Sequence, residues 1–197
     1  ALAKRYPAEV EEDQIRYEQA YADALAALSK NYPDDPDLHA LHAEALMNLH
    51  PWDLWEKNGD PKPWTPEILE ILESNLAQTP DHIASIHLYI HATEASQTPE
   101  LAAPWAAKLP ELAPGAGHLV HMPSHTYIRT GDYHLGTLAN AEAVVVDSLY
   151  TSACHAAGIY PLAYYPHNVH FLAACAAFEG DSQTAIDASW RLVDKLD

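Results

Sequence analysis

The sequence predicts an all-α fold built from consecutive helix pairs, and three observations support this. Ala, Leu and Glu fill long stretches, whereas Gly is scarce, with only 7 residues, which is typical of helices. The alternation of Val, Ile and Thr expected of strands is nearly absent. Most of the 15 prolines fall where helices would start or break. The 197 residues therefore suit one helical domain, 1–197, or a short array of repeats.

Three segments can be laid over one another as helix, short polar turn and second helix. Their first helices are offset by 34 and then by 49 residues, and the 15 extra residues form a Pro- and Tyr-rich insertion at about 149–165. The three turns supply the register, and they fall at Gln97-Thr98, Gly131-Asp132 and Gly180-Asp181. Proline spacing extends the pattern to an earlier first helix at about 36–49, followed by an aromatic insertion at about 51–65 and a helix from Pro66. Pro123 interrupts the helix expected over 115–130 and predicts a kink there.

The 34-residue period and the GDY turn at 131–133, preceded by Tyr127, make the chain resemble a divergent tetratricopeptide-repeat array over nearly its whole length. The strings HLYIHATEAS (87–96), GHLVHMPSHTYIRTGDY (117–133) and YYPHNVHFLAA (164–174) resemble bacterial repeat proteins with no assigned reaction. The resemblance implies an α-solenoid of antiparallel helix pairs whose first helices line a concave groove.

Histidine is the outstanding feature of the composition, with 13 His against 10 Lys and Arg together. In the register that the resemblance implies, seven of the 13 occupy groove positions on three successive first helices. Within each of these helices, the spacing alone also places the histidines on one face. They are His87, His91, His118, His121, His125, His167 and His170.

Pairs of histidines at i, i+4 let two imidazoles on one helix reach one metal ion. His87 and His91 form one such pair and His121 and His125 another, while His167 and His170 are three residues apart. We therefore predict a metal site, mononuclear or dinuclear, with these six residues as ligands. His118 is expected behind the ligands, and the alternative is a polar groove whose histidines bond backbone or acidic groups.

Imidazole-rich sites suit copper, zinc, iron and nickel. Copper is favoured here, because two three-histidine metals would use six imidazoles, as coupled dicopper sites do; zinc and iron are the alternatives. Glu94 and Tyr127 are the candidate catalytic residues, Glu94 as a base one turn beyond His91, although Tyr127 also suits the packing position of the repeat. The predicted function is a copper-dependent oxidoreductase that takes dioxygen or a small-molecule substrate.

Two other functions stay open from the sequence. One is a zinc- or iron-dependent hydrolase at the same site, and the other is a module that binds a peptide, protein or metal without catalysis. The net charge of −18 argues against nucleic acid and anionic membrane surfaces as partners. The compartment stays open between the cytoplasm and the periplasm or secretion.

Overall fold

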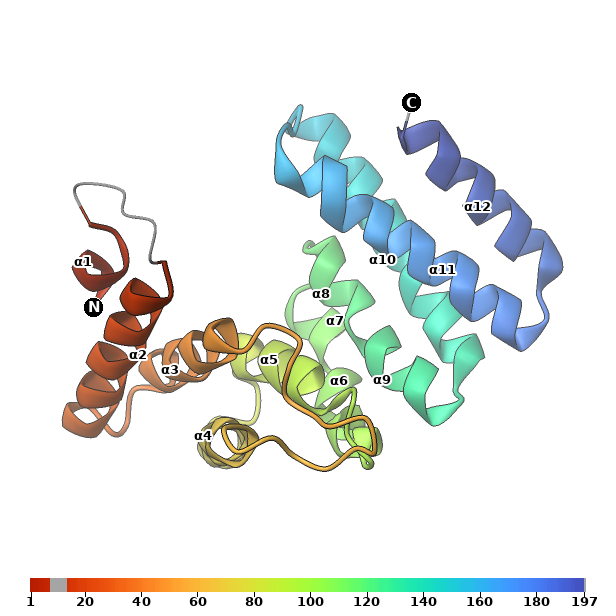
Figure 1. Cartoon of the computed structure of the whole chain (residues 1–197). Helices are drawn as coiled ribbons and strands as arrows, with labels where there is room; N and C mark the ends of the chain where they lie inside the picture. Colours follow the sequence, from red (N-terminus) through yellow and green to blue (C-terminus); the bar gives the residue numbers. More distant parts are fainter. Residues whose placement is uncertain (8–13, 197) are drawn as a thin grey trace. The chain divides into compact units, whose positions relative to one another are not determined.

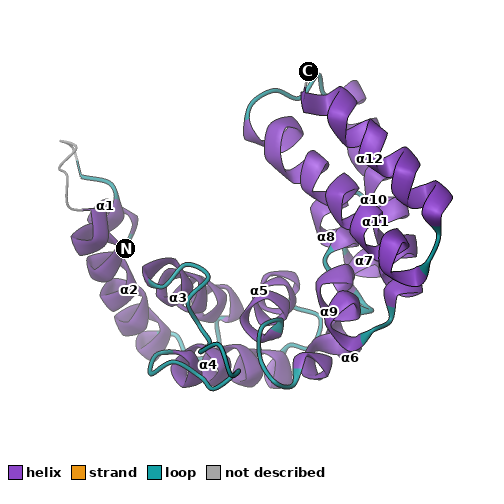
Figure 2. Ribbon diagram, turned by 45° about the vertical axis from the view of Figure 1, so that its right-hand side comes forward, coloured by secondary structure: helices purple, strands orange, loops and turns teal. Residues whose placement is uncertain are grey.

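The computed structural model describes residues 1–7 and 14–196 and divides into two compact units, Ala1–Gln97 and Thr98–Asp197. Within the described residues every regular element is a helix, and Figure 2 shows only helices and loops there. The predicted all-α class is therefore confirmed. In the described part of the chain, no helix combines the length and the apolar character needed to cross a membrane.

Unit 1 is a series of helices in which each packs on the next along the chain. The helices, labelled in Figure 1, are α1 (Leu2–Arg5), α2 (Gln14–Asn31), α3 (Pro36–Leu49), α4 (Thr65–Gln78) and α5 (Ile83–Thr93). The sequence sets the start of α3 locally, because the Asp35 carboxylate caps the backbone amides of Asp37 and Leu38 and Pro36 fits the first turn. The expected helix at 36–49 is present.

The aromatic insertion that follows α3 lies against α5. Trp55 donates its indole N–H to the carbonyl of Ala92 at 2.7 Å, and the ring of Trp64 stacks on His50 with centroids 3.8 Å apart. Trp52 has a φ of 59°, a left-handed conformation that is uncommon for bulky residues. The insertion is thus folded onto the helix that carries His87 and His91.

Unit 2 contains the remaining helices. They are η1 (Pro99–Ala102), α6 (Ala103–Ala106), α7 (Leu109–Leu112), α8 (Gly117–His121), α9 (Pro123–Thr130), α10 (Tyr133–Ala153), the π-helix η2 (Tyr160–Tyr164), α11 (Tyr165–Glu179) and α12 (Ser182–Leu196). Helix α10 packs against α8, α9 and α11, and α11 packs against α12. Gly131 and Gly180 end α9 and α11 in left-handed conformations with φ of 86° and 90°, the expected role of Gly after a helix. Both turns lie where the sequence predicts them.

The segment after Gln97-Thr98 differs from the single second helix that the repeat pattern predicts. It forms three short helices, η1, α6 and α7, instead. Pro99, Pro104 and Pro110 each occupy the first turn of one of them. Proline has no N–H to continue the helix before it, so each proline starts a new helix.

Candidate metal centre

Three histidines of unit 2 converge through their Nε2 atoms. His121 ends α8, His125 lies in the first turn of α9, and His167 lies in the first turn of α11. The Nε2 of His121 is 2.9 Å from that of His125 and 3.0 Å from that of His167. We call these three residues the three-histidine cluster.

Pro123 separates the two helices that carry His121 and His125. The predicted kink is confirmed, since α8 ends at His121 and α9 begins at Pro123. Pro123 has no amide hydrogen for a helical bond, and the amide of His125 bonds the carbonyl of Met122 at 3.1 Å. Both imidazoles are almost completely buried, at 0% exposure for His121 and 4% for His125.

Asn140 of α10 fixes the tautomer of His121. Its Nδ2 donates to the carbonyl of Gly136 at 2.7 Å, so its Oδ1 faces the Nδ1 of His121 at 2.6 Å. Because an amide oxygen only accepts, His121 carries its proton on Nδ1 and a lone pair on Nε2. The hydroxyl of Ser124 lies 3.2 Å from the same Nδ1. Histidines that bind metals are oriented in this way by a partner on the other ring nitrogen.

The lone pair on His121 Nε2 therefore faces two further ring nitrogens. One lone pair accepts one well-aligned N–H, so His125 and His167 cannot both donate to it. Three Nε2 atoms around one point match a metal better, because tetrahedral coordination at about 2.05 Å separates ligand nitrogens by roughly 3.3 Å. Small ring movements would open the cluster to that spacing. Burial, followed by repulsion from His125, lowers the pKa of His121 well below the usual range, so this ring is neutral at neutral pH.

The surroundings of the three-histidine cluster are aromatic. The ring of Phe171, one turn after His167, lies 4.9, 4.6 and 4.7 Å from the rings of His121, His125 and His167. The ring of His118 lies 5.8 Å from that of His121. Phe171 forms an apolar wall on one side of the cluster, while the partly exposed His167 leaves access from solvent.

A second buried network holds the ligand-bearing helices together. Asp147 of α10 is completely buried and accepts hydrogen bonds from the hydroxyl of Tyr160 at 2.6 Å and from Nδ2 of Asn168 at 2.7 Å. A Cβ at Gly117 would lie 1.9 Å from Asp147 Oδ1, so only Gly fits at the start of α8. Asp147 thereby fixes the start of α8 and the residue beside His167 on α11.

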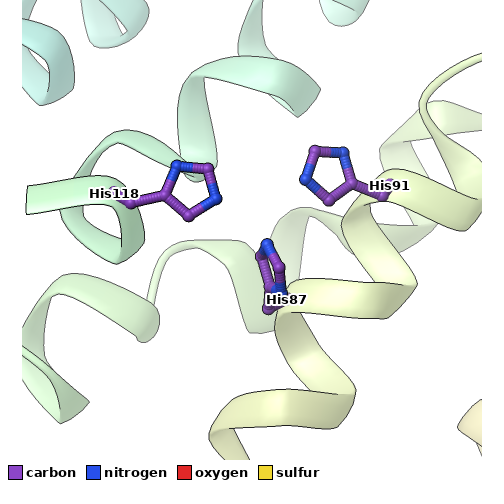
Figure 3. Close-up of side chains that lie close together, drawn as sticks. All are labelled: His87, His91 and His118. Carbon is purple, nitrogen blue, oxygen red and sulfur yellow. The ribbon is translucent and has the colours of Figure 1, made fainter. Parts of the chain in front are cut away.

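The other predicted i, i+4 pair lies in unit 1. His87 and His91 both project from α5, with ring centroids 4.9 Å apart, and Figure 3 shows these two rings. The Nδ1 of His91 is 3.1 Å from the carboxylate of Glu94, and Trp52 meets His91 edge-on at 5.7 Å. Figure 3 also shows His118, which projects from α8. Glu94 therefore orients His91, and its role as a base stays a prediction.

The remaining candidates are placed less centrally. His170 is exposed and lies outside the three-histidine cluster. Tyr127 is half-buried and packs beside Gly136 of α10, and burial raises the pKa of its phenol. The roles of His170 as a metal ligand and of Tyr127 as a catalytic residue stay predictions.

Sequence reasoning missed Asn140, Phe171 and Asp147. Phe171 could have been found, because it follows His167 by four residues and so shares its helical face. Asn140 and Asp147 are polar residues in the otherwise Ala- and Val-rich stretch of α10. A polar residue within an apolar helical stretch is a signal of a buried hydrogen-bonded group, and this signal could have marked them.

Comparison of the chain with protein-family models, curated proteins and solved structures finds no match. The function is therefore inferred from the residues of the site itself. Its nitrogen atoms all come from imidazoles, and the tautomer of His121 leaves a lone pair on Nε2. Three such donors could hold a metal ion and would leave a coordination position for a substrate.

Proposed function

We propose that this protein is a metal-dependent oxidoreductase that binds copper through His121, His125 and His167. The convergence of the three Nε2 atoms, with the His121 tautomer fixed by Asn140, carries the proposal. Neutral nitrogen donors bind copper most strongly among the common divalent metals. Carboxylate-rich sites suit magnesium, calcium and manganese, and this donor set has no carboxylate.

The chemistry follows from an ion with three protein ligands. The fourth position would take dioxygen or a small-molecule substrate, and the partly exposed His167 lies where it would enter. Phe171 covers the three rings from the apolar side and would limit access of water. Copper supplies the one-electron chemistry that this site would use. The binding of a second metal ion by His87 and His91 stays a prediction.

We also propose that the helices form a tetratricopeptide-like array. The pairs α9–α10 and α11–α12, each joined by a left-handed Gly turn, support it. In such an array each ligand would come from the first helix of a pair. If no metal binds, the function of the array would instead be to bind a peptide or protein partner in its groove.

Metal titration tests the proposal directly. Wild-type protein stripped of metal should bind one copper ion tightly and show nitrogen hyperfine splitting from three imidazoles in electron paramagnetic resonance. His121→Ala and His167→Ala should lose this binding. His134→Ala is the matched control, because His134 is exposed on α10 and pairs with Glu179.

The same experiment distinguishes the proposed function from its alternatives. Consumption of dioxygen by the copper-loaded protein in the presence of a reductant supports the oxidoreductase. Tight zinc binding without oxygen consumption refutes the copper role and supports the hydrolase. Copper binding without turnover supports a binding module, and no binding of copper, zinc or iron at micromolar concentrations refutes the metal centre.

A further inference from the structure

A row of aromatic rings connects the three-histidine cluster to the surface of unit 2. His118 lies 5.8 Å from His121 and 4.9 Å from Tyr164, measured between ring centroids. Tyr164 stacks on Tyr160 at 5.6 Å, and Tyr160 meets Tyr150 at 5.1 Å. Tyr150 and Tyr164 are 43% and 40% exposed. One end of the row therefore lies at the three-histidine cluster, and the other end, at Tyr150, is exposed to solvent.

The π-helix η2 produces this continuity. Its five residues begin with Tyr160 and end with Tyr164, and the wider turn places the two rings in a stack with an interplanar angle of 23°. π-helical turns are rare and occur often at functional sites. The row continues from this stack to His118, whose ring meets that of Tyr164 edge-on at an interplanar angle of 72°.

Tyr160 differs from the other rings of the row because its hydroxyl has a proton acceptor. It donates to Asp147 Oδ1 at 2.6 Å, and Asp147 is completely buried. Burial raises the pKa of Asp147 above the ordinary carboxyl value, which makes this carboxylate a better base. Burial and the bond to Asp147 also raise the pKa of Tyr160, so the phenol keeps its proton until an electron leaves.

We infer that Tyr160 and Asp147 form a redox-active pair that relays oxidising equivalents between the metal centre and the surface. This inference rests on the proposed function, which supplies a one-electron oxidant formed at the metal from dioxygen or a peroxide. In the forward step Tyr160 loses one electron, which passes through Tyr164 and His118 and reduces the oxidised metal centre by one unit. The phenolic O–H bond breaks, and its proton moves to Asp147 Oδ1, which becomes a carboxylic acid. The product is a neutral tyrosyl radical beside a protonated Asp147.

The radical returns to tyrosine when a one-electron donor meets the exposed end of the row at Tyr150. The donor gives an electron to Tyr160, and the proton on Asp147 returns to the phenolate oxygen. Charge is thus balanced in the buried pair at every stage. The occupant of the exposed end is a one-electron reductant, such as a phenol or an ascorbate-type enediol.

The first test uses the metal-free protein, so that it does not depend on the metal centre. A photogenerated ruthenium(III) tris-bipyridine complex in solution serves as the oxidant, and electron paramagnetic resonance with transient absorption detects tyrosyl radicals. We expect a long-lived tyrosyl radical in the wild type that is lost in Tyr160→Phe and kept in Tyr133→Phe, whose ring stacks on Phe178 away from the row. Asp147→Asn should slow radical formation, because an amide does not take the proton.

Solvent deuterium separates a redox pair from a structural hydrogen bond. Radical formation should be slower in heavy water for the wild type and independent of deuterium in Asp147→Asn. Equal radical yield and lifetime in the wild type and Tyr160→Phe, with both variants folded by circular dichroism, would overturn the inference. Equal deuterium effects in the wild type and Asp147→Asn would overturn the role of Asp147.

The second test uses copper-loaded protein with hydrogen peroxide. The same Tyr160-dependent radical should appear, and His118→Leu should reduce its yield while metal content stays unchanged. If the protein binds no metal, the proposed function fails and the relay to a metal fails with it, whereas the photochemical test still decides the pair. If metal binds and no Tyr160 radical forms in either test, the inference alone fails.

Discussion

Replacement of Asn140 by Leu tests how the protein prepares His121 for a metal. Leu has a similar size but offers no acceptor to the Nδ1 of His121, now 2.6 Å from Asn140 Oδ1. His121 would keep only the more distant hydroxyl of Ser124, at 3.2 Å. Its proton would then no longer be held on Nδ1, and the Nε2 lone pair that faces the cluster would be present for only part of the time.

The structure gives a magnitude for this change. Loss of the partner that orients a metal-binding histidine typically lowers metal affinity by about 10–100-fold, or roughly 1.4–2.7 kcal/mol. The folded metal-free protein should lose about 1–3 kcal/mol, because a buried ring nitrogen loses its best acceptor. The carbonyl of Gly136, which Asn140 Nδ2 also contacts, belongs to the same helix and keeps its backbone hydrogen bond.

Competition titration with a chelator measures the copper affinity, and urea denaturation measures the free energy of unfolding. Asn140→Asp should retain the affinity, since a carboxylate accepts the same N–H. Glu142→Ala, an exposed change on the same helix, is the control. Wild-type copper affinity in Asn140→Leu, with the three ligands still required, would refute the account of the tautomer.

Three further predictions concern the fold around and outside the cluster. Gly117→Ala should cost about 1–3 kcal/mol of unfolding free energy, because its Cβ would lie 1.9 Å from Asp147. Gly115→Ala is the control, because a Cβ there meets nothing within 4 Å. Equal urea midpoints for the two variants would contradict this prediction. Trp55→Phe removes the 2.7 Å hydrogen bond to α5 and should cost about 1 kcal/mol, measured by thermal unfolding, and an unchanged melting temperature would count against a tethered insertion. Burial lowers the pKa of His42 in the folded state from 6.5, so its unfolded form takes up a proton first and stability falls as pH drops through 6.5. His42→Gln should flatten this dependence in urea titrations, and parallel curves would show that the ring titrates alike in both states.

Local signals account for much of what the sequence predicts correctly. The start of α3 follows from Asp35 and Pro36, and the break before α9 follows from Pro123. The glycine turns at Gly131 and Gly180 fix the ends of α9 and α11 because only Gly adopts that backbone conformation without cost. These features depend on residues within a turn of the chain.

The candidate centre needed information that local patterns do not hold. The histidine register groups His121, His125 and His167, but it cannot separate His167 from His170. Three residues turn a helix by about 300°, so the two rings diverge by about 60°, and only the packing of α11 decides which of them is exposed. Asn140 belongs to another helix, 19 residues after His121, and the pairing of the two depends on how α8 and α10 meet.

Unit 2 contains two buried groups of polar side chains, the Asp147 network and the three-histidine cluster, and we assign a structural role to the first and a chemical role to the second. The Asp147 network joins the start of α8 to Tyr160 and to Asn168, and its hydrogen bonds involve these residues rather than the three rings of the cluster. Burying the polar ring nitrogens of His121 and His125 costs hydration free energy, which an apolar side chain at the same place would not lose. We therefore infer that the Nε2 atoms of His125 and His167, which lie within 3.0 Å of that of His121, are placed for a ligand rather than for folding. Substituting His125 by Leu should therefore preserve or raise the unfolding free energy while it abolishes copper binding, and a large loss of stability would show that the cluster is structural.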